Sequence, residues 1–195
     1  MGISLSGLFQ LFPELRKLFK VTTPEDFDSF LDLHFERCVQ RMEAEAHHLN
    51  EDGEEKLSAF LAAALSLPGL SVIREGYSNG RVDLTIRSES LLSPEQRLAE
   101  AKIYDGPAYH VKAIDQLVSR YSTGRQRVGY VIEYVKKPGI AGLVTTLRKH
   151  ADKNLPVRQS GVTKNHSMQW AYVSEHNHLS EQLIRVVHIN VNLAR

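Results

Sequence analysis

The sequence lacks most of the features that would place it in a specialised class of protein. Among its 195 residues there is a single cysteine, Cys38, which excludes an internal disulfide and a cysteine-based zinc site. The longest apolar stretch, Phe60 to Leu67, is far shorter than the roughly 20 residues that a membrane-spanning helix needs. No P-loop, dinucleotide-binding or nucleophile-elbow pattern is present. We therefore expect a cytoplasmic protein that does not associate with membranes.

The sequence has the composition of an ordinary globular domain. Its charge is unevenly distributed, with a negative N-terminal half followed by a positive segment. Hydrophobic residues make up 42% of the chain and charged residues 24%. Residues 1–96 contain 9 Lys/Arg against 16 Asp/Glu, a net charge of 9 − 16 = −7, and residues 97–170 contain 13 against 5, a net charge of 13 − 5 = +8. Such an asymmetry predicts a basic face for a polyanion on a protein whose overall charge is +1.

The spacing of apolar residues and the turn signals predict the order of the elements. An amphipathic segment over residues 1–20 precedes the core, and its partner is either the core or another protein. Beyond residue 139 the pattern predicts a helix over 139–152, a polar loop over 154–166, a strand over 167–173, and a helix or a strand over 182–191. Between these regions the predicted elements are helices over 25–49, 54–67 and 109–121 and strands over 70–77, 81–87, 97–104 and 128–135.

Two neighbouring strands carry the residues with the most chemistry. On the strand over 97–104, Glu100 and Lys102 point to the same face because alternate residues of a strand do so. Asp83 lies on the preceding strand, just after the Ser78-Asn79-Gly80 turn, which favours a hairpin. If the strands pair, Asp83 and Glu100 converge, and two carboxylates at one point favour a bound cation. Oxygen ligands suit Mg²⁺ or Mn²⁺, and Lys102 would orient the attacking water or help to deprotonate it, and would stabilise charge on a phosphate.

Asp83 followed after sixteen residues by Glu100-Ala101-Lys102 resembles the D…(D/E)xK motif of the PD-(D/E)XK nuclease superfamily. Val82 stands where the motif's name has proline. The resemblance covers about residues 51–135 and implies an α/β, restriction-endonuclease-like αβββαβ core with a mixed central sheet. Residues 1–50 would form an N-terminal helical extension, and residues 51–195 would hold the nuclease domain with C-terminal additions, the whole forming one compact unit.

The resemblance also implies further site residues. Asp83, Glu100 and the backbone carbonyl of Ala101 would hold the metal. The superfamily often adds an acid from the first core helix, for which Glu54 is the first choice because it lies on the apolar stripe of its helix. Glu51 and Glu55 are the alternatives, and all three acids also suit a helix N-terminus without any further role.

The helix after the strand of Glu100 contributes polar residues at one spacing. Lys112, Gln116 and Arg120 form a single stripe, and Gln116 resembles a superfamily glutamine that contacts the site. Tyr121 follows Gln116 by five residues, whereas some nuclease branches have Gln-x-x-x-Tyr, so no role is assigned to it. The alternative for Lys112 and Arg120 is a solvated helix face.

Other groups of residues are given simpler interpretations. We expect His47-His48 and the His176-x-His178 pair to be surface histidines, because neither has an evident third metal ligand. Trp170 and Tyr172 are predicted to share one strand face, as core or as a stacking surface. The candidate phosphate contacts are Arg125, Arg127, Lys136, Lys137, Arg148, Lys149 and Lys153.

Two functional hypotheses follow. The first is a Mg²⁺-dependent endonuclease or exonuclease that acts on DNA. RNA is the alternative substrate. A compact chain without a separate specificity domain suggests a nuclease subunit of a bacterial anti-phage defence or restriction-type system, working with a helicase, ATPase or regulatory subunit, or as a homo-oligomer. The second hypothesis is a non-catalytic nucleic-acid-binding or interaction subunit that keeps the nuclease fold.

Overall fold

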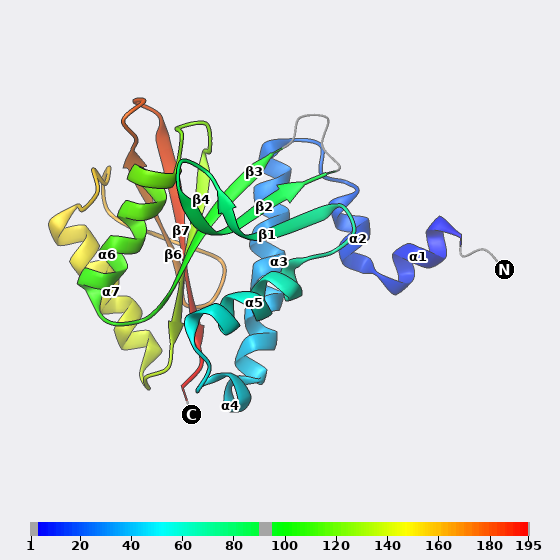
Figure 1. Cartoon of the computed structure of the whole chain (residues 1–195), viewed down its shortest axis with the longest axis horizontal. Coiled ribbons are helices and arrows are strands. Elements are labelled where there is room, and N and C mark those ends of the chain that lie inside the picture. Colours follow the sequence, from blue (N-terminus) through cyan, green and yellow to red (C-terminus); the bar gives the residue numbers. More distant parts are fainter. Residues whose placement is uncertain (1–3, 90–94, 195) are drawn as a thin grey trace.

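A seven-stranded mixed sheet forms the centre of the protein, shown in Figure 1. The computed structural model describes residues 4–89 and 95–194. The strand order is β1-β2-β3-β4-β7-β6-β5, with β3-β4 and β4-β7 parallel and the other pairs antiparallel. The strands are β1 Leu70–Tyr77, β2 Arg81–Ser88, β3 Gln96–Ile103, β4 Val128–Val135, β5 Lys164–Asn165, β6 Ala171–Asn177 and β7 Leu183–Asn192.

Helices cover both faces of this sheet, which confirms the expected α/β class with a mixed sheet. In Figure 1, α3 and α5 lie to one side of the strands, α6 and α7 lie to the other, and α1 and α2 extend away from the sheet. The helices are α1 Leu5–Leu11, α2 Pro13–Leu18, α3 Pro24–Ala44, α4 Ala46–Leu49, α5 Glu54–Leu65, α6 Pro107–Asp115 and α7 Ile140–Asn154, with a π-helical turn η1 over Gln116–Tyr121.

The longest helix, α3, begins at a capping box and lies inside the main core. The Thr23 hydroxyl accepts the Asp26 backbone N–H at 3.1 Å, and the Asp26 carboxylate accepts the Thr23 N–H at 3.1 Å. Phe27, Leu31 and Phe35 of this helix are fully buried in one cluster with residues of the sheet and of α5. The main core therefore contains residues from both sides of position 50. The sequence suggests a boundary at this position, between an N-terminal extension and the domain that follows.

Several predicted elements have different bounds in the structure. The predicted helix over 25–49 ends at Ala44, and the short α4 follows after Glu45. The segment over 182–191, which the sequence leaves open, is the strand β7. The strand predicted over 167–173 is wrong in position, because β6 begins at Ala171. The sequence also predicts a loop over 88–95, but β2 extends to Ser88, and residues 90–94, which include Pro94, lie outside the described residues.

The described residues contain no helix with the length and apolar character required to cross a membrane.

Candidate active site

The pairing between β2 and β3 stops just before the predicted site. The last paired residues are Leu84 and Ala99, and beyond them the edge of β3 loses its strand partner. Carboxylates take the next two backbone donors on this edge: Asp83 Oδ2 accepts the Ala101 N–H at 2.9 Å, and Glu54 Oε2 accepts the Ile103 N–H at 3.2 Å. The N–H and C=O of one strand residue point to the same edge, so the Ala101 carbonyl also faces this gap.

Lys102 lies at the centre of three carboxylates. Its Nζ is 2.8 Å from Glu100 Oε1, 3.4 Å from Asp83 Oδ2 and 3.4 Å from Glu54 Oε1. The negative surroundings raise the pKa of the Lys102 ammonium against the opposing effect of burial. The three carboxylates therefore hold Lys102 as a positive charge in this arrangement.

Glu100 is the most deeply buried member of the cluster. Its side chain is 1% exposed, and its Oε2 has no hydrogen-bond partner among the described residues. Burial and the neighbouring Asp83 carboxylate raise the pKa of Glu100 to about 7, although Lys102 opposes the shift. A buried carboxylate oxygen without a partner is costly, so this atom points to a missing donor or cation at the site.

The site offers only oxygen donors, the kind that a hard divalent cation prefers, but the carboxylates of Glu54, Asp83 and Glu100 do not all lie within 4.8 Å of one another. Asp83, Glu100 and Glu54 offer carboxylate oxygens, and the Ala101 carbonyl faces the same gap. Mg²⁺ and Mn²⁺ prefer such all-oxygen sites, and the unpartnered Glu100 Oε2 supplies a free ligand atom. The alternative acid Glu55 is exposed and lines a small crevice beside Asp83. Glu54 is thus the glutamate of the first core helix that the structure brings to Lys102.

The π-helical turn explains the spacing that did not match the nuclease pattern. In a π-helical turn such as η1 the backbone hydrogen bonds join residues five apart, so Gln116 and Tyr121 lie on one face. The Gln116 amide donates to the Tyr121 hydroxyl at 3.4 Å. Burial and the charge of Glu100 raise the pKa of Tyr121. Tyr121, to which the sequence assigned no role, therefore lies within the electrostatic reach of the carboxylate cluster.

The hairpin between β1 and β2 holds this turn in place. Ser78 Oγ donates to the Tyr121 carbonyl at 2.9 Å, and the Asn79 amide donates to the Arg120 carbonyl at 2.9 Å. These bonds satisfy carbonyls at the end of η1 that have no partner within the helix. At Gly80 a Cβ atom would lie 2.8 Å from the Tyr121 ring, so the turn requires a glycine for this close approach.

Hollows open on two sides of the cluster. A cleft of about 650 Å³ is lined by Lys102 and by residues of α6, η1 and the segment after α7, including Tyr109, Lys112 and Gln116. A smaller crevice of about 40 Å³ contains Glu54, Asp83 and Arg74. Arg74 was not predicted as a site residue. It reaches the crevice because β1 pairs Arg74 with Leu84, the residue next to Asp83.

The predicted basic residues do not form one patch. Arg125 and Arg127 precede β4, whereas Lys136 and Lys137 follow it, so an eight-residue strand of about 26 Å separates the two pairs. Lys136 donates to the Asp52 carbonyl, two residues before Glu54. Arg148 of α7 is bound to Thr163 and Asn165, while Lys149 and Lys153 are exposed on the same helix.

Two predictions about aromatic and histidine residues are corrected. His47 and His48 are exposed as expected, but their rings lie 3.7 Å apart and Glu45 provides a third ligand group within 4.8 Å. Trp170 does not share a strand face with Tyr172, because it precedes β6 and has a φ of 60°. His176 is fully buried, contrary to the prediction of a surface histidine.

A buried chain of hydrogen bonds begins at α6 and crosses the sheet on the face of Lys102. Glu133 of β4 is the register partner of Lys102, and its Oε1 is 2.7 Å from His110 Nδ1. His110 Nε2 is 2.9 Å from His188 Nδ1 and 3.0 Å from the Tyr172 hydroxyl. All of these groups apart from Lys102 are almost completely buried. None of them was predicted as a functional residue.

The direction of this chain follows from its last acceptor. The Val157 carbonyl can only accept, so His176 Nδ1 donates to it at 3.0 Å. Desolvation lowers the pKa of His176 and holds that of His188 well below its usual range, so both rings are neutral. Ser174 Oγ therefore donates to His176 Nε2 at 2.7 Å and accepts from His188 Nε2 at 2.7 Å. His188 Nδ1 is then an acceptor, and His110 Nε2 must carry the proton between them.

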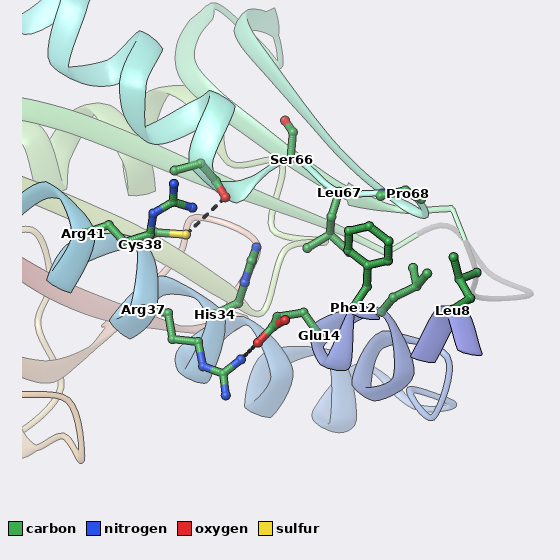
Figure 2. Close-up of a pocket in the computed structure, with 12 residues that line it drawn as sticks. Leu8, Phe12, Glu14, His34, Arg37, Cys38, Arg41, Ser66, Leu67 and Pro68 are labelled. Carbon is green, nitrogen blue, oxygen red and sulfur yellow. Dashed lines mark hydrogen bonds and ion pairs between the residues drawn. The ribbon is translucent and has the colours of Figure 1, made fainter. Parts of the chain in front are cut away.

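A separate cavity of about 500 Å³ lies between α1, α2, α3 and the end of α5, as Figure 2 shows. Its walls are largely apolar, with Leu8, Phe12 and Leu67 at one end. An ion pair between Arg37 and Glu14 joins α3 to α2 beside it. Burial raises the pKa of the Cys38 thiol, which donates to the Ala64 carbonyl, to about 11. This cavity has no cluster of carboxylates comparable to that around Lys102.

Comparison of the chain with protein-family models, with curated proteins and with solved structures finds no match.

Proposed function

We propose that this protein is a metal-dependent nuclease that hydrolyses phosphodiester bonds of DNA. One observation carries the proposal: Glu54, Asp83 and Glu100, from three different elements, surround one lysine, while a buried Glu100 oxygen has no partner. Among the described residues, unpartnered carboxylate oxygens also occur at Asp32 and Glu133, so the convergence of three carboxylates on one lysine is what distinguishes this site. The cluster also follows the order and spacing that resemble the PD-(D/E)XK motif.

The proposed roles follow from the contacts. Asp83, Glu100 and the Ala101 carbonyl would hold Mg²⁺ or Mn²⁺, with Glu54 assisting. When bound, the metal would polarise the phosphate and lower the pKa of water. Lys102 keeps its charge and stabilises the negative charge that builds up on the phosphate oxygens. Hydrolysis forms a bond from the water oxygen to phosphorus and breaks the bond to the leaving sugar oxygen, which takes up a proton.

The test is cleavage of supercoiled plasmid and linear DNA with Mg²⁺ or Mn²⁺. We expect Asp83→Asn, Glu100→Gln and Lys102→Met to lose at least about 100-fold in rate, the usual scale for removing one such group. Glu54→Gln should lose activity, whereas its neighbour Glu55→Gln is the matched control and should keep it. Undiminished cleavage by Asp83→Asn and Lys102→Met would overturn the assignment.

The second candidate function is a non-catalytic nucleic-acid-binding subunit with the same fold. Calorimetric titration with Mn²⁺ separates the two candidates. A nuclease site should bind the ion in the wild type and lose it in Asp83→Asn, whereas a purely structural cluster should give no heat that depends on Asp83.

We also propose that the nuclease works with a protein partner, as in bacterial defence or restriction-type systems. Leu11, Phe12 and Phe19 around α1 and α2 and Leu33 on α3 are large apolar side chains that are more than half exposed. Such residues in one region favour a contact surface for an ATPase, a regulatory subunit or a second copy. A monomer by light scattering that is fully active alone would count against this proposal.

A further inference from the structure

The cleft beside Lys102 has two different walls. One wall is α6 with the start of η1, which contributes Tyr109, Lys112 and Gln116, and the other includes Val157 from the segment after α7. Lys102 joins the cleft to the carboxylate cluster, so a chain bound here would continue directly into the site. At about 650 Å³ the cleft is in the range of pockets that take one small ligand. It has room for one nucleotide and not for a double helix.

The lining offers a partner for each part of a nucleotide. The Tyr109 ring is half-buried, and the Lys112 ammonium lies over one of its faces, 5.8 Å from the centroid, so a base stacks on the other face or displaces the ammonium. An aromatic ring stacks on a base of any sequence, and an exposed lysine binds a phosphate. Gln116 presents an amide that can donate and accept, while Val157 offers an apolar surface. The Asp115 carboxylate also lines the cleft, three residues after Lys112 on α6, and its charge opposes part of the attraction of Lys112 for a phosphate.

The buried chain of hydrogen bonds ties the two walls together. His110 directly follows Tyr109 in α6, and the chain from His110 ends on the carbonyl of Val157. Val157 has a φ of 54° and Arg158 also has a φ of 54°, a backbone conformation that a β-branched residue rarely adopts without support. The bond from His176 supplies such support, so the cleft is held open before any ligand enters.

We infer that this cleft receives one unpaired nucleotide next to the scissile phosphate, and that the protein acts on single-stranded nucleic acid or on unpaired ends. The inference rests on the proposed function, because it concerns the substrate of that same site. Tyr109 stacks on the base, and Lys112 binds the phosphate that follows. An intact duplex cannot place a base in the cleft without unpairing it, which costs a few kcal/mol.

Binding without cleavage tests the inference independently of catalysis. Fluorescence anisotropy in EDTA compares a labelled 12-nucleotide single strand with a blunt 12-base-pair duplex, each over a range of salt concentrations. We expect the single strand to bind at least about 10-fold more tightly, since stacking of one base on an aromatic ring is worth about that much. Tyr109→Ala should lose about 10-fold in affinity for the single strand, and Tyr109→Phe should keep the wild-type affinity.

Lys112→Ala should weaken single-strand binding and reduce the slope of log K against log salt by about 0.7, the loss of one phosphate contact. Lys17→Ala, at an exposed lysine of α2, is the matched control and should bind as the wild type. Equal or tighter binding of the duplex, or wild-type affinity in both Tyr109→Ala and Lys112→Ala, would overturn the inference. The nuclease proposal fails separately, if Asp83→Asn leaves metal binding and cleavage unchanged.

Discussion

Asp83 completes the hydrogen bonding of β3, because its Oδ2 accepts the Ala101 N–H at 2.9 Å where the ladder with β2 has ended. The carboxylate therefore accepts a backbone hydrogen bond that a neighbouring strand would otherwise accept. It also faces the ammonium of Lys102. Loss of the proposed metal ligand and loss of the backbone acceptor can be separated by substitution.

Asp83→Ala and Asp83→Asn should differ in stability but not in metal binding. Alanine leaves the Ala101 N–H without an acceptor, at a cost of about 1–3 kcal/mol, whereas the asparagine carbonyl can still accept it. Both changes also remove repulsion between Asp83 and Glu100, so the difference between them isolates the backbone bond. Urea unfolding of the two variants measures it. Equal free energies of unfolding would show that water satisfies the donor.

The metal-free protein should lose stability as the pH rises from about 4.5 to about 7, through the titration of Glu100. The pKa of Glu100 is about 7 in the folded chain, against 4.5 as its ordinary value, so the folded state binds more protons in this window. Unfolding in EDTA at several pH values should show this slope in the wild type and not in Glu100→Gln. If the free energy of unfolding had the same pH dependence in both proteins, the titration of a buried Glu100 would be contradicted.

Buried neutral histidines should make the protein sensitive to acid. Burial lowers the pKa of His34 and of His176, and holds that of His188 well below its ordinary value of 6.5, so their stabilising contribution is present above about 6.5 and is lost as the pH falls further. In the His188→Gln variant the melting temperature should fall less steeply below pH 6.5 than in the wild type. Thermal melts at several pH values measure this. Since the Glu100 effect has the opposite sign, each variant is compared with the wild type at the same pH.

Ser174→Ala should be more destabilising than its small change in volume suggests. Ser174 Oγ contacts both His188 and His176 at 2.7 Å, so alanine leaves a buried donor and a buried acceptor without partners. Each such group costs about 1–3 kcal/mol. We expect the free energy of unfolding to fall by about 2–4 kcal/mol in urea. Ser29→Ala, on the exposed side of α3, is the matched control and should change it by less than about 0.5 kcal/mol.

Cys38 should resist alkylation in the folded protein although it lines a cavity. The pKa of its thiol is about 11 and the residue is 2% exposed, so little reactive thiolate is present near neutral pH. Iodoacetamide labelling at pH 8, followed by mass spectrometry, should be slow in buffer and fast in 6 M urea, a condition chosen as about twice a typical midpoint. Rapid labelling in buffer would show that the N-terminal helices open readily.

The central elements of the site were accessible from the sequence because their signals are local. Alternation placed Glu100 and Lys102 on one face, and the antiparallel pairing of the neighbouring strands β2 and β3 brought Asp83 next to them. The role of Glu54 could be proposed only through the family resemblance. Its contact with the Ile103 N–H depends on where β2 leaves β3, which a single sequence does not reveal.

The elements that were missed depend on contacts distant in sequence. β7 lies in the middle of the sheet with both faces covered, so it lacks the alternation of a half-exposed strand, and the buried His188 and Asn190 interrupt its apolar pattern further. His176 looked like a surface residue because its partners, Ser174 and the Val157 carbonyl, are visible only in the folded chain. The π-helical turn likewise has no sequence signal beyond the Gln116–Tyr121 spacing.

The directed chain from His110 to the Val157 carbonyl has a consequence for how this protein can diverge. His188, Ser174 and His176 each donate at one end and accept at the other, so none of these three positions can change its polarity without reversing its neighbour. The residues at positions 110, 174, 176 and 188 should consequently be inherited together or replaced together by apolar side chains. A relative that retains half of this set would have to recruit a water molecule to bridge the interruption.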